Sequence, residues 1–144
     1  MKFVIHTDGG ARGNPGPAAI GVVVEKIVDG RSSIVDEFGK TIGEATNNVA
    51  EYTAVEEALK AMKSLEFGEK NEKFEIYFYL DSILVVNQLN GLFKIKDPTL
   101  RSLVTEIRIL EQEVGGVVHY TAVPRQQNWR ADFLVNQALD ENVS

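Results

Sequence analysis

The chain has 144 residues, 44% of them hydrophobic and 25% charged, which is typical of one globular domain with a full hydrophobic core. The absence of cysteine excludes a disulfide framework, a thiolate zinc site and a thiol nucleophile. The formal net charge of −6 argues against a nucleic-acid partner. Acidic residues that bind cations would reduce this negative charge, so the charge does not exclude such a partner.

Three strands are expected in the first third of the chain. Apolar residues run through Lys2–Thr7, Ala19–Ile27 and Ser33–Ile42. The glycine-rich turn Gly9–Pro17 separates the first two strands, and the turn signal Asp29-Gly30 separates the second from the third. This order predicts an antiparallel meander.

Helices and strands alternate in the rest of the chain. Asn48 is the expected N-cap of a helix that runs to Leu65, with Glu51 at the capping-box position, and a charged loop over 68–73 follows. The remaining expected elements are, in order, the strand Phe74–Leu80, the short helix Ser82–Leu89, the helix Pro98–Val114, the strand Val117–Val123 and a helix capped by Asn128 that runs from Trp129 to Leu139. The sequence therefore predicts a single domain over residues 1–144 with an α/β fold, a five-stranded mixed sheet flanked by helices.

Four carboxylates are placed at or near the ends of these elements. Asp8 and Asp81 each follow an apolar strand, Glu51 lies in the first turn of a helix, and Asp132 lies in the last helix. The carboxyl ends of strands are where α/β sheets form their sites. Carboxylates gathered in one place repel one another and need a counter-charge, which divalent metal usually supplies.

Each acid also has a plain structural explanation. Glu51 continues the apolar stripe of Val55, Ala58 and Met62, but a capping box with Asn48 explains it equally well. The two acids that follow strands are also ordinary turn residues.

Asp132 lies on the helical stripe of Trp129, Val135 and Leu139, and the helix dipole also favours an acid near a helix N-terminus. One such acid is weak evidence, whereas four in this placement favour a metal site. Two cations about 3.5–4 Å apart support hydrolysis at phosphorus, because they activate water and stabilise the leaving oxygen. Hard oxygen ligands favour Mg²⁺ or Mn²⁺ over zinc.

Polar residues beside the acids suit a nucleic-acid backbone. The turn after Asp8 exposes backbone amides and lets a phosphodiester approach closely, with Arg12 and Asn14 nearby. A tight loop between strands explains its glycines equally well. Asn47 and Asn48 offer amides to sugar hydroxyls and base edges in a minor groove, and helix capping is the alternative for one of them.

These segments together resemble ribonuclease H type 1, in its short form without a basic handle. The resemblance covers almost the whole chain, from about Phe3 to Leu139, and keeps the order of the elements. It rests on four motifs, TDGGARGNPGP, ATNNVAEYTAVEEAL, LDSILVVNQLNG and VPRQQNWRADFLVNQAL.

The resemblance implies a ribonuclease H-like fold and cleavage of the RNA strand of RNA/DNA hybrids. It implies two Mg²⁺ ions, with Mn²⁺ as a substitute, and products with 3′-hydroxyl and 5′-phosphate ends. The resemblance also implies that Asp8 is a ligand of both ions. Glu51 and Asp81 then complete one ion site, and Asp132 completes the other. The residues that the loop chemistry and the resemblance together indicate for substrate contact are Gly9, Gly10, Arg12, Asn14, Asn47, Asn48, Ser82 and Arg125.

The sequence departs from the family pattern at three places. The loop before the last helix lacks the histidine that many members carry, and its Arg125 stays protonated, which makes it a poor proton shuttle. The histidines present, His6 and His119, lie in expected strands, where structural roles are favoured. Ile83 stands where some members have a polar hybrid contact.

The third departure is a short connection, Gly91–Asp97, where longer bacterial members insert a basic handle. We expect weaker hybrid binding as a result. Four bases are expected to recover part of it, namely Lys94, Lys96, Arg101 and Arg130.

Two other functions and one wider specificity stay open. A binding module without chemistry is disfavoured because all four acids are present. A DNA nuclease of the same fold, such as a transposase or junction resolvase, is disfavoured by the length and the paired asparagines. An enzyme without a handle would also fit double-stranded RNA, which offers 2′-hydroxyls on both strands. We expect a monomer in the cytoplasm without a membrane partner, since there is no apolar run of spanning length and no signal-peptide pattern.

Overall fold

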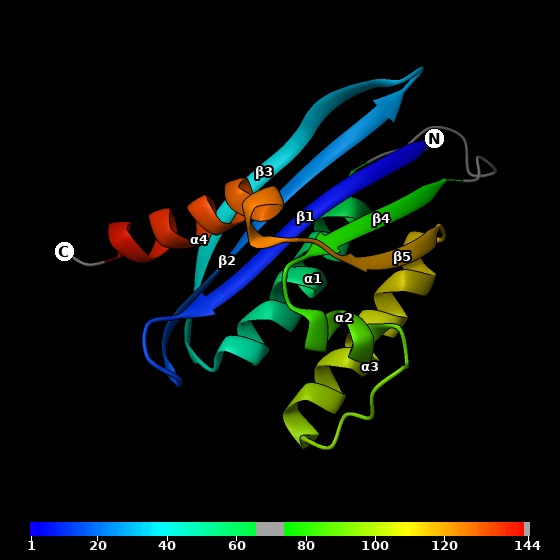
Figure 1. Ribbon diagram of the computed structural model, residues 1–144. Helices are drawn as coiled ribbons and strands as arrows, with labels where there is room; N and C mark the ends of the chain where they lie inside the picture. Colours follow the sequence, from blue (N-terminus) through cyan, green and yellow to red (C-terminus); the bar gives the residue numbers. More distant parts are fainter. Residues whose placement is uncertain (66–73, 143–144) are drawn as a thin grey trace.

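The computed structural model describes residues 1–65 and 74–142, so the loop expected over 68–73 lies outside the described residues. At its centre the described strands form a five-stranded sheet in the order β3-β2-β1-β4-β5 (Figure 1). The strands are β1 (Lys2–Ala11), β2 (Gly16–Val28), β3 (Arg31–Ala45), β4 (Glu75–Leu80) and β5 (Val117–Ala122). The helices are α1 (Asn47–Ser64), α2 (Ile83–Leu89), α3 (Pro98–Val114) and α4 (Trp129–Glu141), the last preceded by a 3₁₀ turn over Arg125–Asn128.

The predicted mixed sheet and its meander are confirmed. Strands β1, β2 and β3 pair antiparallel, whereas β4 pairs parallel with β1 and β5 parallel with β4. Strands β2 and β3 are longer than their apolar runs, because exposed polar residues at their ends still pair through the backbone. The central strand β1 therefore joins the meander to the parallel part of the sheet.

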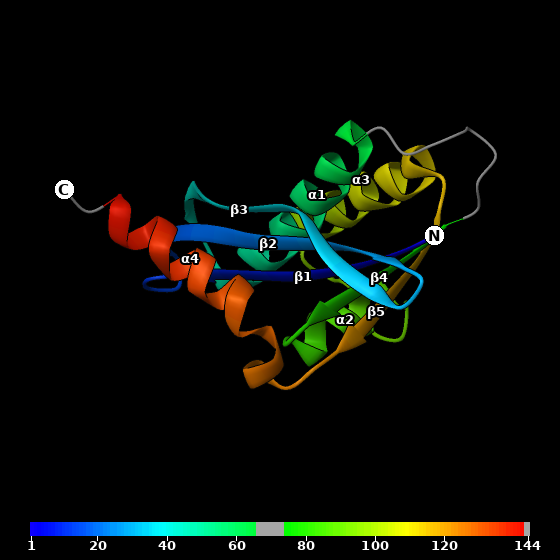
Figure 2. The same ribbon diagram turned by 90° about the horizontal axis from the view of Figure 1, so that it is seen from above.

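Helices cover the two faces of the sheet unequally. The turned view shows α1 and α3 together on one face and α4 on the opposite face (Figure 2). Helix α4 packs on β2, β3 and β1, at one end of the sheet. A helix that approaches from each side can thus deliver side chains to the same sheet end.

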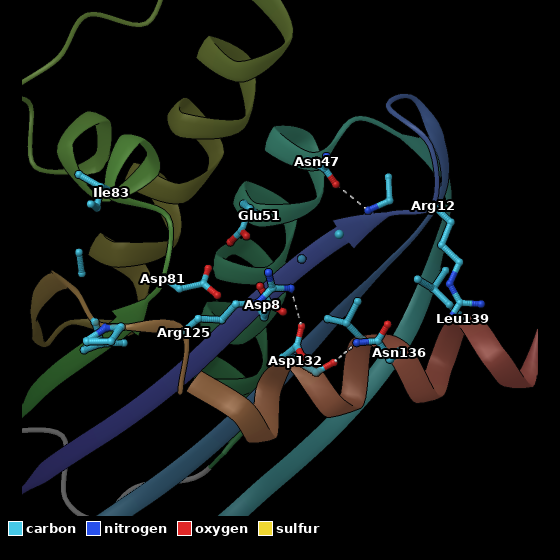
Figure 3. Close-up of a pocket in the computed structure, with 17 residues that line it drawn as sticks. Asp8, Arg12, Asn47, Glu51, Asp81, Ile83, Arg125, Asp132, Asn136 and Leu139 are labelled. Atoms are coloured by element: carbon cyan, nitrogen blue, oxygen red, sulfur yellow. Dashed lines mark hydrogen bonds and ion pairs between the residues drawn. The ribbon is translucent and has the colours of Figure 1, made fainter. Parts of the chain in front are cut away.

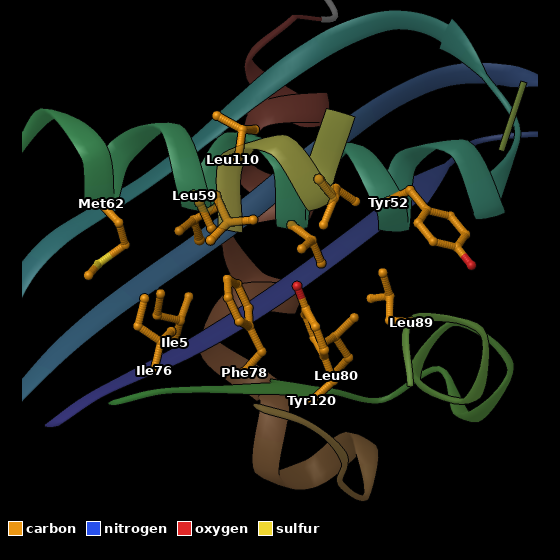
Figure 4. Close-up of a cluster of buried hydrophobic side chains, with 14 of the residues drawn as sticks. Ile5, Tyr52, Leu59, Met62, Ile76, Phe78, Leu80, Leu89, Leu110 and Tyr120 are labelled. Carbon is orange, nitrogen blue, oxygen red and sulfur yellow. The ribbon is translucent and has the colours of Figure 1, made fainter. Parts of the chain in front are cut away.

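The main core lies between the sheet and α1, α2 and α3 (Figure 4). Its largest fully buried side chains include Tyr52 on α1 and Phe78 on β4. Phe78 stacks on Tyr120 of β5 with ring centroids 5.2 Å apart. A much smaller cluster of Ala19, Val135 and Leu139 lies beneath α4, so α4 is held by fewer apolar contacts than α1.

The expected helix caps are only partly found. Thr46, not Asn48, caps α1, since its Oγ1 accepts a hydrogen bond from the Val49 N–H at 3.2 Å. The prediction failed because β3 continues to Ala45, which leaves Thr46 as the single residue between strand and helix. Glu51 therefore lies past the first turn and outside the capping-box position. None of the helices in residues 1–65 and 74–142 is long and apolar enough to cross a membrane.

Candidate active site

Four carboxylates from four elements reach one end of the sheet (Figure 3). Asp8 comes from β1, Glu51 from α1, Asp81 from the residue after β4, and Asp132 from the first turn of α4. All four line one cleft of about 840 Å³. The gathering predicted from separate segments is therefore found in the structure.

Asp8 lies inside β1 rather than at its end, which corrects the expected strand boundary. The three residues after it continue the pairing with β2. A Cβ at Gly9 would lie 2.3 Å from the carbonyl oxygen of Ala50, so α1 approaches the strand backbone directly at this point. This close approach brings Glu51, the next residue of α1, beside Asp8.

Asp8, Glu51 and Asp81 form a tight set, called here the inner group. One oxygen atom from each carboxylate lies within 4.8 Å of the other two. Asp8 is 6% exposed and Glu51 is 8% exposed. Oε2 of Glu51 is buried and has no hydrogen-bond partner among the described residues. A buried carboxylate oxygen in this state needs an external partner, which the capping-box explanation does not provide.

The inner group strongly resists full ionisation. Burial raises the pKa of Asp8 to about 7, and the nearby charges of Asp81 and Asp132 add to the rise. Burial, followed by the charge of Asp8, raises the pKa of Glu51 well above its usual range. Burial also raises the pKa of Asp81, against the opposing positive charge of Arg125. Bound cations would relieve all three costs at once.

Asp132 is held differently from the inner group. It is half-buried and accepts an ion-pair contact from Nη2 of Arg125 at 3.4 Å. The side chain of Arg125 is 78% exposed, so this arginine lies at the open rim of the cleft. Arg125 therefore supplies Asp132 with a positive counter-charge.

The donor set fits hard divalent cations. It consists of carboxylate oxygens, with one oxygen of Glu51 left without a partner, and the described cleft contains no histidine. Oxygen ligands of this kind suit Mg²⁺ or Mn²⁺ rather than zinc or copper. The four acids are therefore suited to holding metal ions at the sheet end.

Comparison with known proteins decides the family. The family described as "Reverse transcriptase-like" matches residues 6–138. A ribonuclease H of Clostridium botulinum is 35% identical over 97% of this chain and 97% of its own length. The structure of LC11-RNase H1 in complex with an RNA/DNA hybrid has a TM-score of 0.88 and 43% identity, and covers 99% of both chains. The chain belongs to the ribonuclease H family. The resemblance inferred from the four motifs is confirmed.

Other ribonuclease H relatives are longer than this chain. Ribonuclease HI of Halobacterium salinarum is 44% identical over 94% of this chain, which spans 63% of that protein. A bifunctional protein of Mycobacterium tuberculosis is 40% identical over 97% of this chain, which spans 36% of that protein. The family is metal-dependent, in agreement with the acidic cluster.

Two asparagines tie the loop after β1 to the start of α1. Oδ1 of Asn47 accepts a hydrogen bond from the Ala11 N–H at 2.9 Å, and the Asn47 N–H donates to Oδ1 of Asn14 at 2.9 Å. Asn47 lines the cleft, and its side-chain amino group keeps two donors for another partner. The predicted contact residues Asn14 and Asn47 are therefore linked within one network.

Other predicted contact residues divide into two sets. Gly9, Gly10, Arg12 and Arg125 line the cleft, and Arg12 forms an ion pair with Asp140 of α4. Asn14, Asn48 and Ser82 do not line it. Oγ of Ser82 accepts a hydrogen bond from the Val85 N–H at 3.3 Å and so caps α2.

The bases expected to strengthen hybrid binding are not all available. Arg130 donates to both carboxylate oxygens of Glu37 on β3, at 2.8 and 2.7 Å. This pair joins α4 to β3 and leaves Arg130 engaged. Both histidines lie in strands outside the cleft, as predicted, with His6 stacked on Tyr79 and His119 on Tyr77.

Sequence reasoning missed two polar residues around Asp132. Asn128 was expected to cap α4, but its side chain makes no cap hydrogen bond and is 1% exposed. Nδ2 of Asn128 instead donates to the carbonyl oxygen of Thr7 at 2.8 Å. Asn136 lines the cleft and donates to the carbonyl oxygen of Asp132 at 3.0 Å. Helical spacing of four residues from Asp132 would have indicated Asn136, whereas nothing local indicates the Asn128 contact.

Proposed function

We propose that this chain is an endonuclease that hydrolyses the RNA strand of RNA/DNA hybrids and leaves 3′-hydroxyl and 5′-phosphate ends. The observation that carries the proposal is the inner group, with oxygen atoms within 4.8 Å and a buried, unpartnered oxygen on Glu51. The relative LC11-RNase H1, which shares its fold along the whole chain, was crystallised with an RNA/DNA hybrid. Residues 1–144 would act as a single domain.

The proposed cofactor is a pair of Mg²⁺ ions, with Mn²⁺ as a substitute. The four residues that would hold them are Asp8, Glu51, Asp81 and Asp132. Bound divalent ions lower the pKa of an attacking water and stabilise the departing 3′ oxygen. The raised pKa values of Asp8 and Glu51 agree with the proposal, since they indicate buried carboxylates without a counter-charge, which bound cations would supply as the carboxyl protons leave.

The chain's own residues would select and orient the hybrid. Asn47 lines the cleft, and its side-chain amino group, which makes no hydrogen bond to the described residues, suits a 2′-hydroxyl or a base edge in the minor groove. Gly10 lines the cleft without a side chain, and a Cβ there would lie 3.7 Å from Cγ1 of Val135, which lines the same cleft, so a sugar-phosphate backbone would have closer access to the acids. Recognition of the 2′-hydroxyl would restrict cleavage to the RNA strand.

Arg125 would serve as a charge at the rim and not as a proton carrier. Its guanidinium stays protonated at neutral pH, and Asp132 raises its pKa further. It can therefore attract a backbone phosphate beside Asp132 but cannot shuttle a proton. Release of protons to water would replace the role that a histidine has in many ribonucleases H.

The test is a cleavage assay with either strand of an RNA/DNA hybrid end-labelled, in Mg²⁺, in Mn²⁺ and in EDTA. We expect metal-dependent cuts confined to the RNA strand. Matched RNA and DNA duplexes run in parallel as controls. An intact hybrid in both metals would contradict the proposal and favour a binding module of the same fold.

Double-stranded RNA is the second candidate substrate. The chain has only residues 90–97 between α2 and α3, so the hybrid contacts that a basic handle would add are missing. A binding surface that relies on the minor groove meets 2′-hydroxyls in double-stranded RNA as well. Cuts in the RNA duplex of the same assay would establish this wider specificity. We further propose a monomer located in the cytoplasm, since a chain without cysteine has no need of an oxidising compartment.

A further inference from the structure

Asp132 reaches the site from the opposite side of the sheet to Glu51. Helix α1 covers one face and α4 the other, so the separation between Asp132 and Asp8 depends on how closely α4 lies against the sheet (Figures 2 and 3). Beneath α4 lies the small cluster of Ala19, Val135 and Leu139, to which the buried side chains of Ala131 and Leu134 add on the same helix. Such a small cluster sets the distance of a helix less strictly than a large core.

Two glycines lie under the first turns of α4. In the sheet, Asp8 pairs with Gly21 of β2, and Gly21 pairs with Gly39 of β3, so the three residues form one row across the strands. A Cβ at Gly21 would lie 2.2 Å from the carbonyl oxygen of Ala131. A Cβ at Gly39 would lie 2.5 Å from the carbonyl oxygen of Leu134. The helix backbone therefore rests directly on the strand backbone at these two positions.

The reason for glycine here is space and not backbone conformation. Neither Gly21 nor Gly39 has a positive φ, so any residue could adopt their backbone angles. A methyl group at either position would meet backbone atoms, which cannot rotate away. The helix would have to move outward. The part that moves includes Ala131 and therefore Asp132, the next residue in the helix.

Asn128 fixes the start of α4 from the other direction. Its Nδ2 donates to the carbonyl oxygen of Thr7, the residue before Asp8. The side chain is 1% exposed, and its Oδ1 has no partner among the described residues. Asn128 therefore links the turn before Asp132 to the strand that carries Asp8.

We propose that Gly21, Gly39 and Asn128 are positioning residues that set the distance between Asp132 and Asp8. The glycines let α4 approach, and the asparagine draws its first turn to β1. This inference rests on the proposed function, because the distance matters for an activity that needs both carboxylates. It assigns a role in the site to residues that contact neither metal nor substrate.

The test compares Gly39→Ala with Leu59→Ala, a core variant on α1 that is destabilised away from α4. Both variants are assayed at a temperature at which circular dichroism shows that each is folded. For Gly39→Ala we expect kcat on the hybrid to fall about 100-fold, since a displacement of about 1 Å of a catalytic group has an effect of this size. We expect KM for the hybrid to change less than about twofold, because Asn47 lies on α1 and stays in place. Leu59→Ala should keep both values.

Metal binding gives a readout that does not depend on activity. Titration with Mn²⁺, followed by electron paramagnetic resonance, should show weaker binding to Gly39→Ala than to the unaltered chain and to Leu59→Ala. Asn128→Ala should change binding in the same direction. Unchanged Mn²⁺ binding in both variants would overturn the proposal.

A longer carboxylate supplies the decisive check. Asp132→Glu alone should lower kcat. In the Gly39→Ala background the same change should raise kcat at least about fivefold above that of Gly39→Ala, because the extra methylene of glutamate spans part of the displacement. Independent, multiplicative losses in the double variant would overturn the positioning role. If the unaltered chain cleaves no hybrid at all, the proposed function fails, and the Mn²⁺ titration still tests the geometry.

Discussion

The inner group and Asp132 belong to one site but are held by opposite means. The inner group lies close together, and burial, followed by the charges of neighbouring carboxylates, raises the pKa of Asp8 and of Glu51. Asp132 is half-buried on the other face of the sheet, over a small cluster, and has Arg125 as a counter-charge. The difference shows that one part of the site stores electrostatic repulsion, whereas the other depends on the placement of a helix.

The largest expected effect comes from Asp8→Asn, which removes the central charge of the inner group. Cleavage of the hybrid should fall by about 10³-fold or more, since the carboxylate nearest to all the others is lost. The metal-free variant should be more stable at pH 8, by about 2 kcal/mol, because repulsion and the burial of a charge are relieved. Gel assays and urea unfolding in EDTA measure both.

Glu113→Gln is the matched control for Asp8→Asn, because it removes a surface carboxylate that pairs with Lys63 far from the cleft. It should leave cleavage unchanged. An Asp8→Asn protein that does not fold would contradict the interpretation of the inner group as a site of stored repulsion.

Asp132→Asn separates the two parts of the site. We expect kcat to fall about 100-fold, because the proposed metal pair loses one of the carboxylates that would hold it. The stability of the metal-free protein should change by less than about 1 kcal/mol, since the lost ion pair with Arg125 is exposed to solvent. A stability gain as large as that of Asp8→Asn would remove the distinction between the two parts. Thermal unfolding beside the cleavage assay provides the comparison.

The pH dependence of stability provides a third test, in EDTA. The pKa of Asp8 rises from its ordinary value of 3.8 to about 7 on folding. Between these values the folded protein holds a proton that the unfolded chain has released, so the free energy of unfolding falls as pH rises. Stability from this group is complete below pH 3.8 and is lost as pH passes 7. Mg²⁺ should flatten the profile, and Asp8→Asn should weaken it; an unchanged slope in that variant would refute the assignment.

The smallest expected effect comes from Arg125→Ala. Its side chain is exposed, so stability should change by less than about 1 kcal/mol. Loss of a rim charge should raise KM for the hybrid by about 3- to 10-fold at low salt, and less at high salt, because salt screens the attraction to phosphate. Steady-state kinetics at two ionic strengths measure this. Arg125→Lys should recover most of the loss, and an equal loss in both variants would argue against a role in charge alone.

The local patterns predicted the elements and the acids, and failed where distant segments decide the structure. The stripe through Val55 and Met62 placed Glu51 on the buried face of its helix, because helical periodicity is a local property. The cap of α1 was misplaced by two residues, since the end of β3 depends on its pairing with β2. The hydrogen bond from Asn128 to Thr7 spans 121 positions, and no local pattern indicates it.

Gly21 and Gly39 show the same limit of prediction from local sequence patterns. In sequence they resemble interruptions of apolar strands, and the reason for glycine at both positions is a helix that begins about 110 positions after Gly21 and about 90 after Gly39. The segment after Asp8 was predicted as a turn, yet Gly9 and Gly10 continue the strand because β2 pairs with them, and the turn itself starts only after Ala11. Tertiary contacts override the turn propensity of glycine at these positions.

The position of α4 late in the chain has a consequence for synthesis of the protein. β1, α1 and β4 leave the ribosome first, so the inner group is available once residue 81 has emerged. Asp132 follows only after β5, and α4 has to dock across the sheet before the fourth acid is in place. A growing chain therefore gathers three of the four carboxylates before the helix that carries the fourth has docked.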